Sequence, residues 1–148
     1  MQESHKNFAI ELFNQTWDLI EKEDRNQSEI DRMINAAHGS HYQWEFAGEA
    51  VNIARGEWLI SRVYARLGRG EPCVYHASRC LVITLENNLK DFDLAFAYES
   101  MARAAKITEN EVESAKYLTL AQESGALIAD SDDQEYFFSE LKTLTPDL

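Results

Sequence analysis

The sequence contains few of the residues that interrupt helices: two prolines and six glycines in 148 positions. Proline and glycine usually separate short strands, so their scarcity favours long helices with short connections. The chain is 45% hydrophobic, and its length is sufficient for one domain to bury a core without metal or disulfide support. We therefore expect a single all-α domain.

Basic residues are also scarce. The chain has 14 Lys and Arg against 26 Asp and Glu, a formal net charge of −12 at pH 7. Such a surface repels the phosphates of nucleic acids, so we expect no nucleic-acid partner. No apolar run approaches the ~18 residues that cross a bilayer, and the first residues, MQESHKNF, lack the segments of a signal peptide. We expect no membrane association and a cytoplasmic location.

The motifs that carry most enzyme chemistry are missing. There is no phosphate-loop or dinucleotide glycine pattern and no glycine-flanked serine elbow. Cys73 and Cys80 lie seven positions apart on one expected helix, which separates their Cα atoms by about 10 Å, too far for a disulfide. We interpret them as buried structural thiols and expect neither a cofactor nor an enzyme.

Apolar residues recur at intervals of three and four along most of the chain, the pattern of amphipathic helices. In the second helix, Ser28 is the expected N-cap, Asp31 the capping-box acid and Gly39 a point of bending. Gly125 is expected to end the sixth helix. Seven helices result, as pairs at about 6–47, 49–88 and 91–124 and a capping helix at about 131–144.

The third and fourth expected helices carry a distinctive order of residues. W-x-I-S-x-x-Y-x-x-x-G runs from Trp58 to Gly68, and small residues follow at Cys73, Ala77 and Cys80. This order resembles the tetratricopeptide repeat, and the segment 38–105 resembles uncharacterised bacterial proteins of that type. A second copy lies about 41 positions later, longer than the usual period of 34. It places Ala102, Ala105 and Glu109 at the positions of Ser61, Tyr64 and Gly68.

The resemblance implies a right-handed superhelix of helix pairs in which the first helix of each pair lines a concave surface. Two stripes at helical spacing would meet there and make a basic, aromatic groove. Arginine binds carboxylates in two-pronged fashion, so we expect a short acidic peptide or a chain-terminal carboxylate as guest. The expected groove residues are Arg55, Trp58, Arg62 and Arg66 from one helix and Phe96, Glu99, Arg103 and Lys106 from the other.

Two other interpretations of these residues remain open. In the first, the arginines pair with acidic side chains and brace the fold; the candidates are Glu45, Glu49, Glu57 and Glu99. In the second, the protein is a small-molecule- or metal-binding sensor, or an enzyme, with a site between helices near His38, His41 and Trp44. His38, His41 and Glu45 share one helical face, but a fourth ligand is missing, so we expect no metal. The short array leaves exposed ends through which the protein could form a homodimer.

Overall fold

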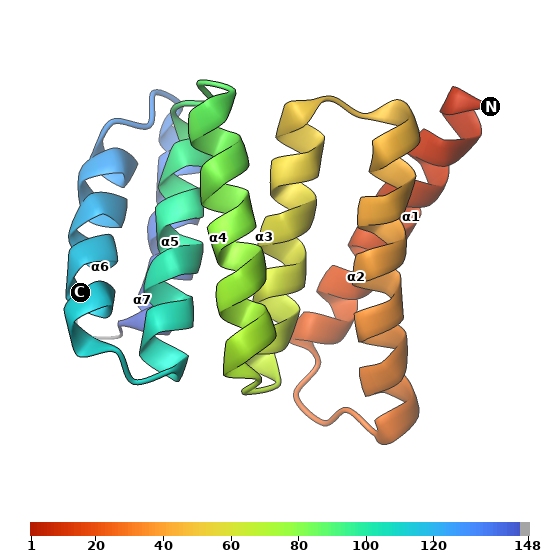
Figure 1. Ribbon diagram of the computed structural model, residues 1–148, viewed down its shortest axis with the longest axis horizontal. Helices are drawn as coiled ribbons and strands as arrows, with labels where there is room; N and C mark the ends of the chain where they lie inside the picture. The colour runs from red at the N-terminus through yellow and green to blue at the C-terminus, as the bar shows by residue number, and fades with distance from the viewer. Residues whose placement is uncertain (146–148) are drawn as a thin grey trace.

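The computed structural model describes residues 1–145, which form seven helices and no strand (Figure 1). This confirms the all-α prediction. Neighbouring helices pack as antiparallel hairpins, α1 with α2, α3 with α4 and α5 with α6, while α7 lies behind α5 in Figure 1. None of these helices has both the length and the apolarity needed to cross a bilayer. The helices are α1 (Gln2–Glu21), α2 (Gln27–Ala47), α3 (Ala50–Arg66), α4 (Gly70–Glu86), α5 (Phe92–Ile107), α6 (Glu111–Ala126) and α7 (Ser131–Leu144).

The start of α2 differs from the prediction. Its N-cap is Asn26, and the capping box is completed by Glu29, not by Ser28 with Asp31. Asn26 Oδ1 accepts a hydrogen bond from the backbone N–H of Glu29 at 2.9 Å, and the Glu29 carboxylate accepts one from the N–H of Asn26 at 3.0 Å. The helix also continues through Gly39, where a bend was predicted. Glycine suits this position because its bare backbone lies against Leu12 of α1.

The turns of the second and third hairpins are built alike, 41 positions apart. Gly68 and Glu109 both adopt positive φ, of 71° and 58°. In each turn the next backbone N–H reaches back to the carbonyl five residues earlier at 2.9 Å, from Arg69 to Tyr64 and from Asn110 to Ala105. This is the Schellman way of ending a helix, which normally selects glycine at the positive φ. Glu109 occupies the glycine position of the same structure.

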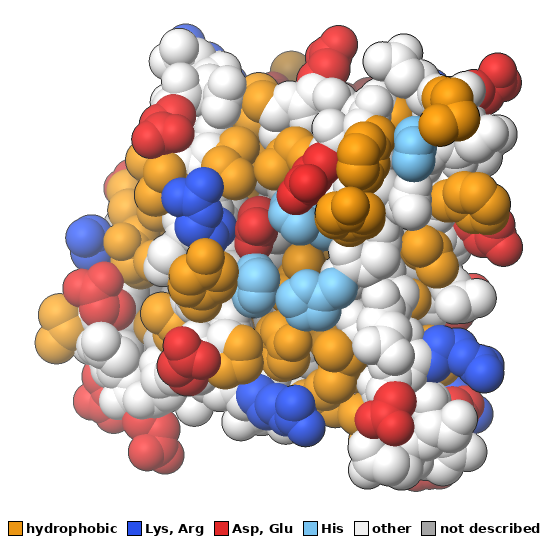
Figure 2. Space-filling view, turned by 45° about the vertical axis from the view of Figure 1, so that its right-hand side comes forward, with side chains coloured by type: hydrophobic (Ala, Val, Ile, Leu, Met, Phe, Trp, Pro, Cys, Tyr) orange, Lys and Arg blue, Asp and Glu red, His pale blue; other side chains and the backbone are white. Residues whose placement is uncertain are grey.

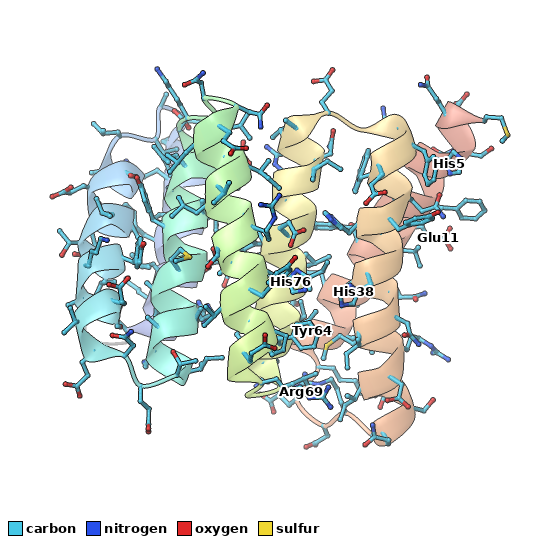
Figure 3. The ribbon with its side chains drawn as sticks, viewed as in Figure 1. His5, Glu11, His38, Tyr64, Arg69 and His76 are labelled. Carbon is cyan, nitrogen blue, oxygen red and sulfur yellow. The ribbon has the colours of Figure 1, made fainter. Side chains whose placement is uncertain are left out.

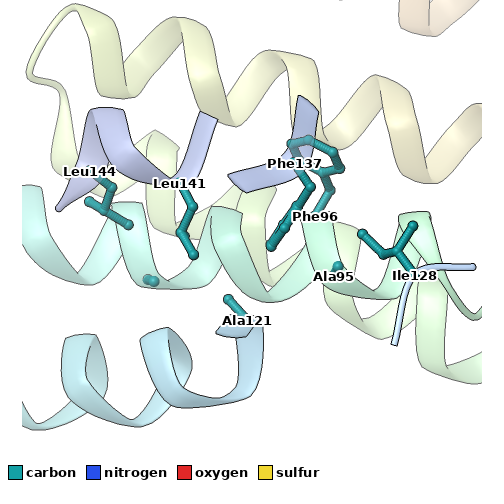
Figure 4. Packing of buried hydrophobic residues seen from close by; sticks show 8 residues of the cluster. Ala95, Phe96, Ala121, Ile128, Phe137, Leu141 and Leu144 are labelled. Carbon is teal, nitrogen blue, oxygen red and sulfur yellow. The ribbon is translucent and has the colours of Figure 1, made fainter. Parts of the chain in front are cut away.

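The last helix covers the open side of the third hairpin. Phe137, Leu141 and Leu144 of α7 are buried against α5 and α6 (Figure 4). Gly125 allows this contact, because a Cβ there would lie 2.5 Å from a ring carbon of Phe137. Helix α6 ends at Ala126, one residue beyond the predicted end at Gly125. The glycine is needed there because its bare backbone admits an aromatic ring.

The cysteines are buried and free, in agreement with the prediction. Cys73 lies where α3 and α4 approach closely, and its carbonyl accepts a hydrogen bond from the Ser61 hydroxyl at 3.1 Å. Burial raises the pKa of the Cys80 thiol to about 12, so this side chain stays protonated and unreactive at neutral pH.

Candidate functional site

A groove runs between α1 and α7, which do not pack against each other in the described part of the chain. Helices α3 and α5 pack against each other and form the floor of the groove. Two adjoining pockets open in this groove, and Trp17 of α1 lines both. We call them the aromatic pocket and the cation pocket.

The aromatic pocket has a volume of about 370 Å³. Arg55 and Asp93 lie in its wall, and Cys80 and Thr84 of α4 contribute from a third helix. Such a volume and such a wall fit a small ligand or one large side chain of a partner. Its aromatic lining comprises Phe13, Trp17, Trp58, Phe92, Phe96 and Tyr136.

The cation pocket has a volume of about 610 Å³ and adjoins the aromatic pocket at Trp17. It is where most of the predicted basic stripe converges, because α3 and α5 each contribute two cations. Acidic side chains of α1 and α7 also border it. Its charged lining comprises Arg62, Arg66, Arg103 and Lys106 with Glu21, Glu23 and Glu140.

Arg62 is held from several sides and is only 8% exposed. Its guanidinium lies 2.9 Å from Glu140 of α7 and 3.5 Å from Glu99 of α5. It also lies over the rings of Trp17 and Trp58, at 5.6 and 5.8 Å from their centres. Arg62 therefore joins four helices, α1, α3, α5 and α7, and its charge is used within the protein.

Arg103 and Glu99 complete this internal network. Glu99 is fully buried, and its carboxylate accepts a hydrogen bond from Arg103 Nε at 3.3 Å. Arg103 also donates to the hydroxyl of Thr143 on α7 at 2.8 Å. These predicted groove residues thus brace α3, α5 and α7, as the alternative interpretation expected for Glu99.

The remaining residues of the two predicted stripes, Arg55, Trp58 and Phe96, line the aromatic pocket. Arg55 is half-exposed and makes a two-pronged pair with Asp93, at 2.8 and 3.1 Å. Hydrogen bonding to Asp93 raises the pKa of Arg55. Phe96 is buried and meets Trp58 edge-on, with ring centres 5.4 Å apart, so both belong to the packing of the pocket wall.

Arg66 and Lys106 are the two exposed cations of the cation pocket. Arg66 donates from Nε to the carbonyl of Ile20 at 3.3 Å, near the end of α1. Lys106 donates to the carbonyl of Leu144. In residues 1–145 neither is paired with a carboxylate.

The opposite side of α3 carries a second group of side chains, which come from three different helices. We call it the histidine cluster: His38 and His41 of α2, Glu57 and Tyr64 of α3, and His76 of α4. The Glu57 carboxylate accepts a hydrogen bond from each of two histidines, His76 Nδ1 at 2.6 Å and His41 Nε2 at 3.1 Å. His38 Nε2 lies 2.9 Å from the Tyr64 hydroxyl. Figure 3 shows His38, Tyr64 and His76 converging between the three helices.

This cluster has unusual electrostatics. Burial opposes the ionisation of Glu57, but hydrogen bonds from His41 and His76 outweigh it and lower the Glu57 pKa to about 2. Burial, followed by the charges of His76 and His41, lowers the pKa of His38. Figure 2 shows histidines gathered on one face among hydrophobic side chains. Tyr75 is exposed and meets His76 edge-on, with ring centres 5.0 Å apart.

The cluster overlaps only in part with the predicted alternative site. His38 and His41 belong to the histidine cluster. Among the described residues, neither Trp44 nor Glu45 contributes to the hydrogen bonds of the cluster. No group of three His, Cys, Asp or Glu side chains in that part of the chain is arranged to hold a metal ion. One sequence signal does point to the cluster: Glu57 and Tyr64 lie seven positions apart, two turns along one face of α3.

The chain was also compared with known proteins. It matches no protein-family model, no curated protein and no solved structure.

Proposed function

We propose that the protein is a binding module that holds a short peptide in the groove between α1 and α7. We infer a tetratricopeptide-like arrangement, a right-handed superhelix of three helix pairs with α7 as its cap. The two alike turns at an interval of 41 residues support this arrangement, as does the close approach of α3 and α4 at Ser61. No step of this role needs a catalytic group.

The observation that carries the proposal is the adjacency of the two pockets on either side of Trp17. A peptide carboxylate would bind Arg66 and Lys106, the two exposed cations. A neighbouring apolar side chain would enter the aromatic pocket, where burial supplies binding free energy. A guest with both groups matches both pockets, and a guest with one group matches only half of the groove.

The overall charge narrows the choice of guest. At a net charge of −12 the protein repels a strongly acidic chain at long range. The local cations offset this repulsion for one or two carboxylates, because charge-assisted hydrogen bonds act at short range. We therefore propose a peptide with a single carboxylate beside its apolar side chain, with the chain terminus as the simplest source.

The test uses a panel of fluorescein-labelled hexapeptides with free or amidated C-termini, measured by fluorescence anisotropy. Wild-type protein should retain peptides with a free carboxylate and an apolar side chain next to it. An Arg66→Gln, Lys106→Gln variant should bind them more weakly by about tenfold or more, because at least one charge-assisted hydrogen bond is lost.

The matched control is Arg32→Gln, Arg79→Gln, which removes the same charge from exposed positions on α2 and α4. It should bind like wild type. Equal loss in both variants would show that general charge, not the groove, controls binding, and indifference to amidation would contradict the carboxylate site. Circular dichroism checks that all variants keep their helices.

A further inference from the structure

The aromatic pocket contains one polar group for which the fold supplies no strong partner. Thr84 lines the pocket from α4, is 1% exposed, and its Oγ1 has no hydrogen-bond partner within normal geometry in the described residues. A buried hydroxyl without a well-formed hydrogen bond destabilises the fold, so such groups are rare in folded proteins. This hydroxyl is the polar feature of the pocket that packing leaves poorly satisfied.

The immediate surroundings of Thr84 do not supply a strong partner. The Cys80 thiol, one turn earlier on α4, is the neighbour that Thr84 can reach, and their interaction partly opposes the effect of burial, which raises the Cys80 pKa. A thiol is a weak hydrogen-bonding group, so this contact leaves the hydroxyl poorly satisfied. Rotation about χ1 exchanges the positions of the threonine hydroxyl and methyl group, and both rotamers occur in helices. A guest in the pocket can therefore meet the hydroxyl without movement of the backbone.

The charges around the pocket favour a neutral guest. Two guanidinium groups already lie over its rings, Arg55 over Phe92 at 5.9 Å and Arg62 over Trp58 at 5.8 Å. A cationic guest would compete with them for the ring faces. An anionic guest would meet Asp18 and Asp93, which also line the pocket.

We propose that the aromatic pocket binds a neutral phenol ring, whose hydroxyl hydrogen-bonds to Thr84. Aromatic walls fit a flat ring by edge-to-face and offset contacts, and a phenol usually finds a hydrogen-bond partner when it is buried. The threonine hydroxyl can donate to or accept from a phenol. The ring comes either from a free phenol or from a tyrosine of a bound peptide; the second source rests on the proposed function.

The first experiment compares p-cresol with toluene, which differ by the hydroxyl alone. Binding is followed by tryptophan fluorescence excited at about 295 nm, because Trp17 and Trp58 line the pocket. Wild type should prefer p-cresol by about tenfold, the effect of one buried hydrogen bond. Thr84→Val should lose this preference and still bind toluene, whereas Thr84→Ser, which keeps the hydroxyl, should retain it.

Three results would overturn the inference: no saturable binding of p-cresol to wild type, equal binding of p-cresol and toluene, or an unchanged preference in Thr84→Val. A peptide arm then distinguishes the sources. Hexapeptides with a free C-terminus and Tyr or Phe at the apolar position are titrated against wild type and Thr84→Val. A Tyr preference that depends on Thr84 identifies the peptide source. Binding of p-cresol without binding of either peptide supports the pocket as a small-phenol site and refutes the proposed function.

Discussion

The two sides of α3 hold their neighbours by different chemistry. On the groove side, Arg62 lies between the carboxylates of Glu99 and Glu140. On the other side, Glu57 is held by His41 and His76, and the neighbouring His38 has a lowered pKa because it is buried. One helix thus carries an arginine brace on one side and the histidine cluster on the other. The lowered pKa values of His38 and Glu57 make the stability contributed by the histidine side depend on pH.

The largest effect is expected from breaking the arginine brace. Arg62→Met removes the shared partner of Glu99 and Glu140 and leaves the fully buried Glu99 with Arg103 alone. Removing one partner of a buried ion pair costs about 3–5 kcal/mol. Because Glu99 keeps its contact with Arg103, we expect a loss near the lower end of this range. Urea unfolding measures the loss. A change below about 1 kcal/mol would show that the network behaves like a surface pair.

The next largest effect is expected from a substitution beside the histidine cluster. Gly56 of α3 lies directly beneath His41, and a Cβ at this position would collide with His41 Nδ1. Gly56→Ala should displace the ring, weaken its contact with Glu57 and cost about 1–3 kcal/mol, the usual effect of overpacking. Without this collision, alanine would stabilise a helix by about 1 kcal/mol, so stabilisation of that size would contradict the packing described.

Lowering the pH should destabilise the protein through the histidine side of α3. The pKa of His38 is lowered in the folded protein, so the unfolded chain binds this proton more readily, and the stability contributed by neutral His38 is lost as the pH falls below 6.5. Glu57 adds a second loss, because its lowered pKa stabilises the fold above about 4.5 and this contribution disappears towards pH 2. Urea unfolding at pH 7.5, 6 and 5 should therefore show a falling free energy of unfolding.

The matched variants for this titration are His38→Gln and His5→Gln. The first removes the titrating ring from the cluster, where His41, His76, Glu57 and Tyr64 face it from three helices, and should flatten the pH dependence between 7 and 5. The second removes a histidine that stacks on Phe46 at the edge of α1 and α2, outside the cluster. Equal slopes in both variants would rule out His38 as the source.

The smallest effect is expected at Arg55. Its pair with Asp93 has good geometry, but the Arg55 side chain is 51% exposed. Exposed pairs contribute about 0–1 kcal/mol and weaken with salt, so Arg55→Ala should change the free energy of unfolding by less than Arg62→Met does. A loss comparable to that of Arg62→Met would place Arg55 in the buried network.

Much of this architecture could be predicted from the sequence. The spacing of apolar residues indicated each helix, and α7 begins and ends where expected, because its acidic first turn and apolar stripe are both local signals. Local competition explains the errors: Asn26 and Ser28 are both good N-caps, and only the structure shows that Glu29 completes a box with Asn26. Gly125 does lie one residue from the end of α6, but its contact with Phe137 could not be predicted, because Phe137 lies on another helix.

The candidate site could be predicted only in part. Helical spacing placed Arg55, Arg62 and Arg66 on one stripe, but it could not show that Glu140, 78 positions after Arg62, would reach across to it. The residues of the histidine cluster come from three helices. The spacing of residues within one helix carries no information about their distance from residues of another helix. Pairing of distant helices therefore decided which cations are used internally and which remain exposed.

The dependence of this network on α7 has a consequence for synthesis of the chain. A ribosome makes α3 and α5, with Arg62, Glu99 and Arg103, before it makes Glu140 and Thr143, which hold the two arginines from outside. A nascent chain that ends before residue 131 would have the floor of the groove without its second wall, and Phe96 would lack its contact with Phe137. Such an intermediate exposes apolar surface, which favours aggregation until the last helix emerges.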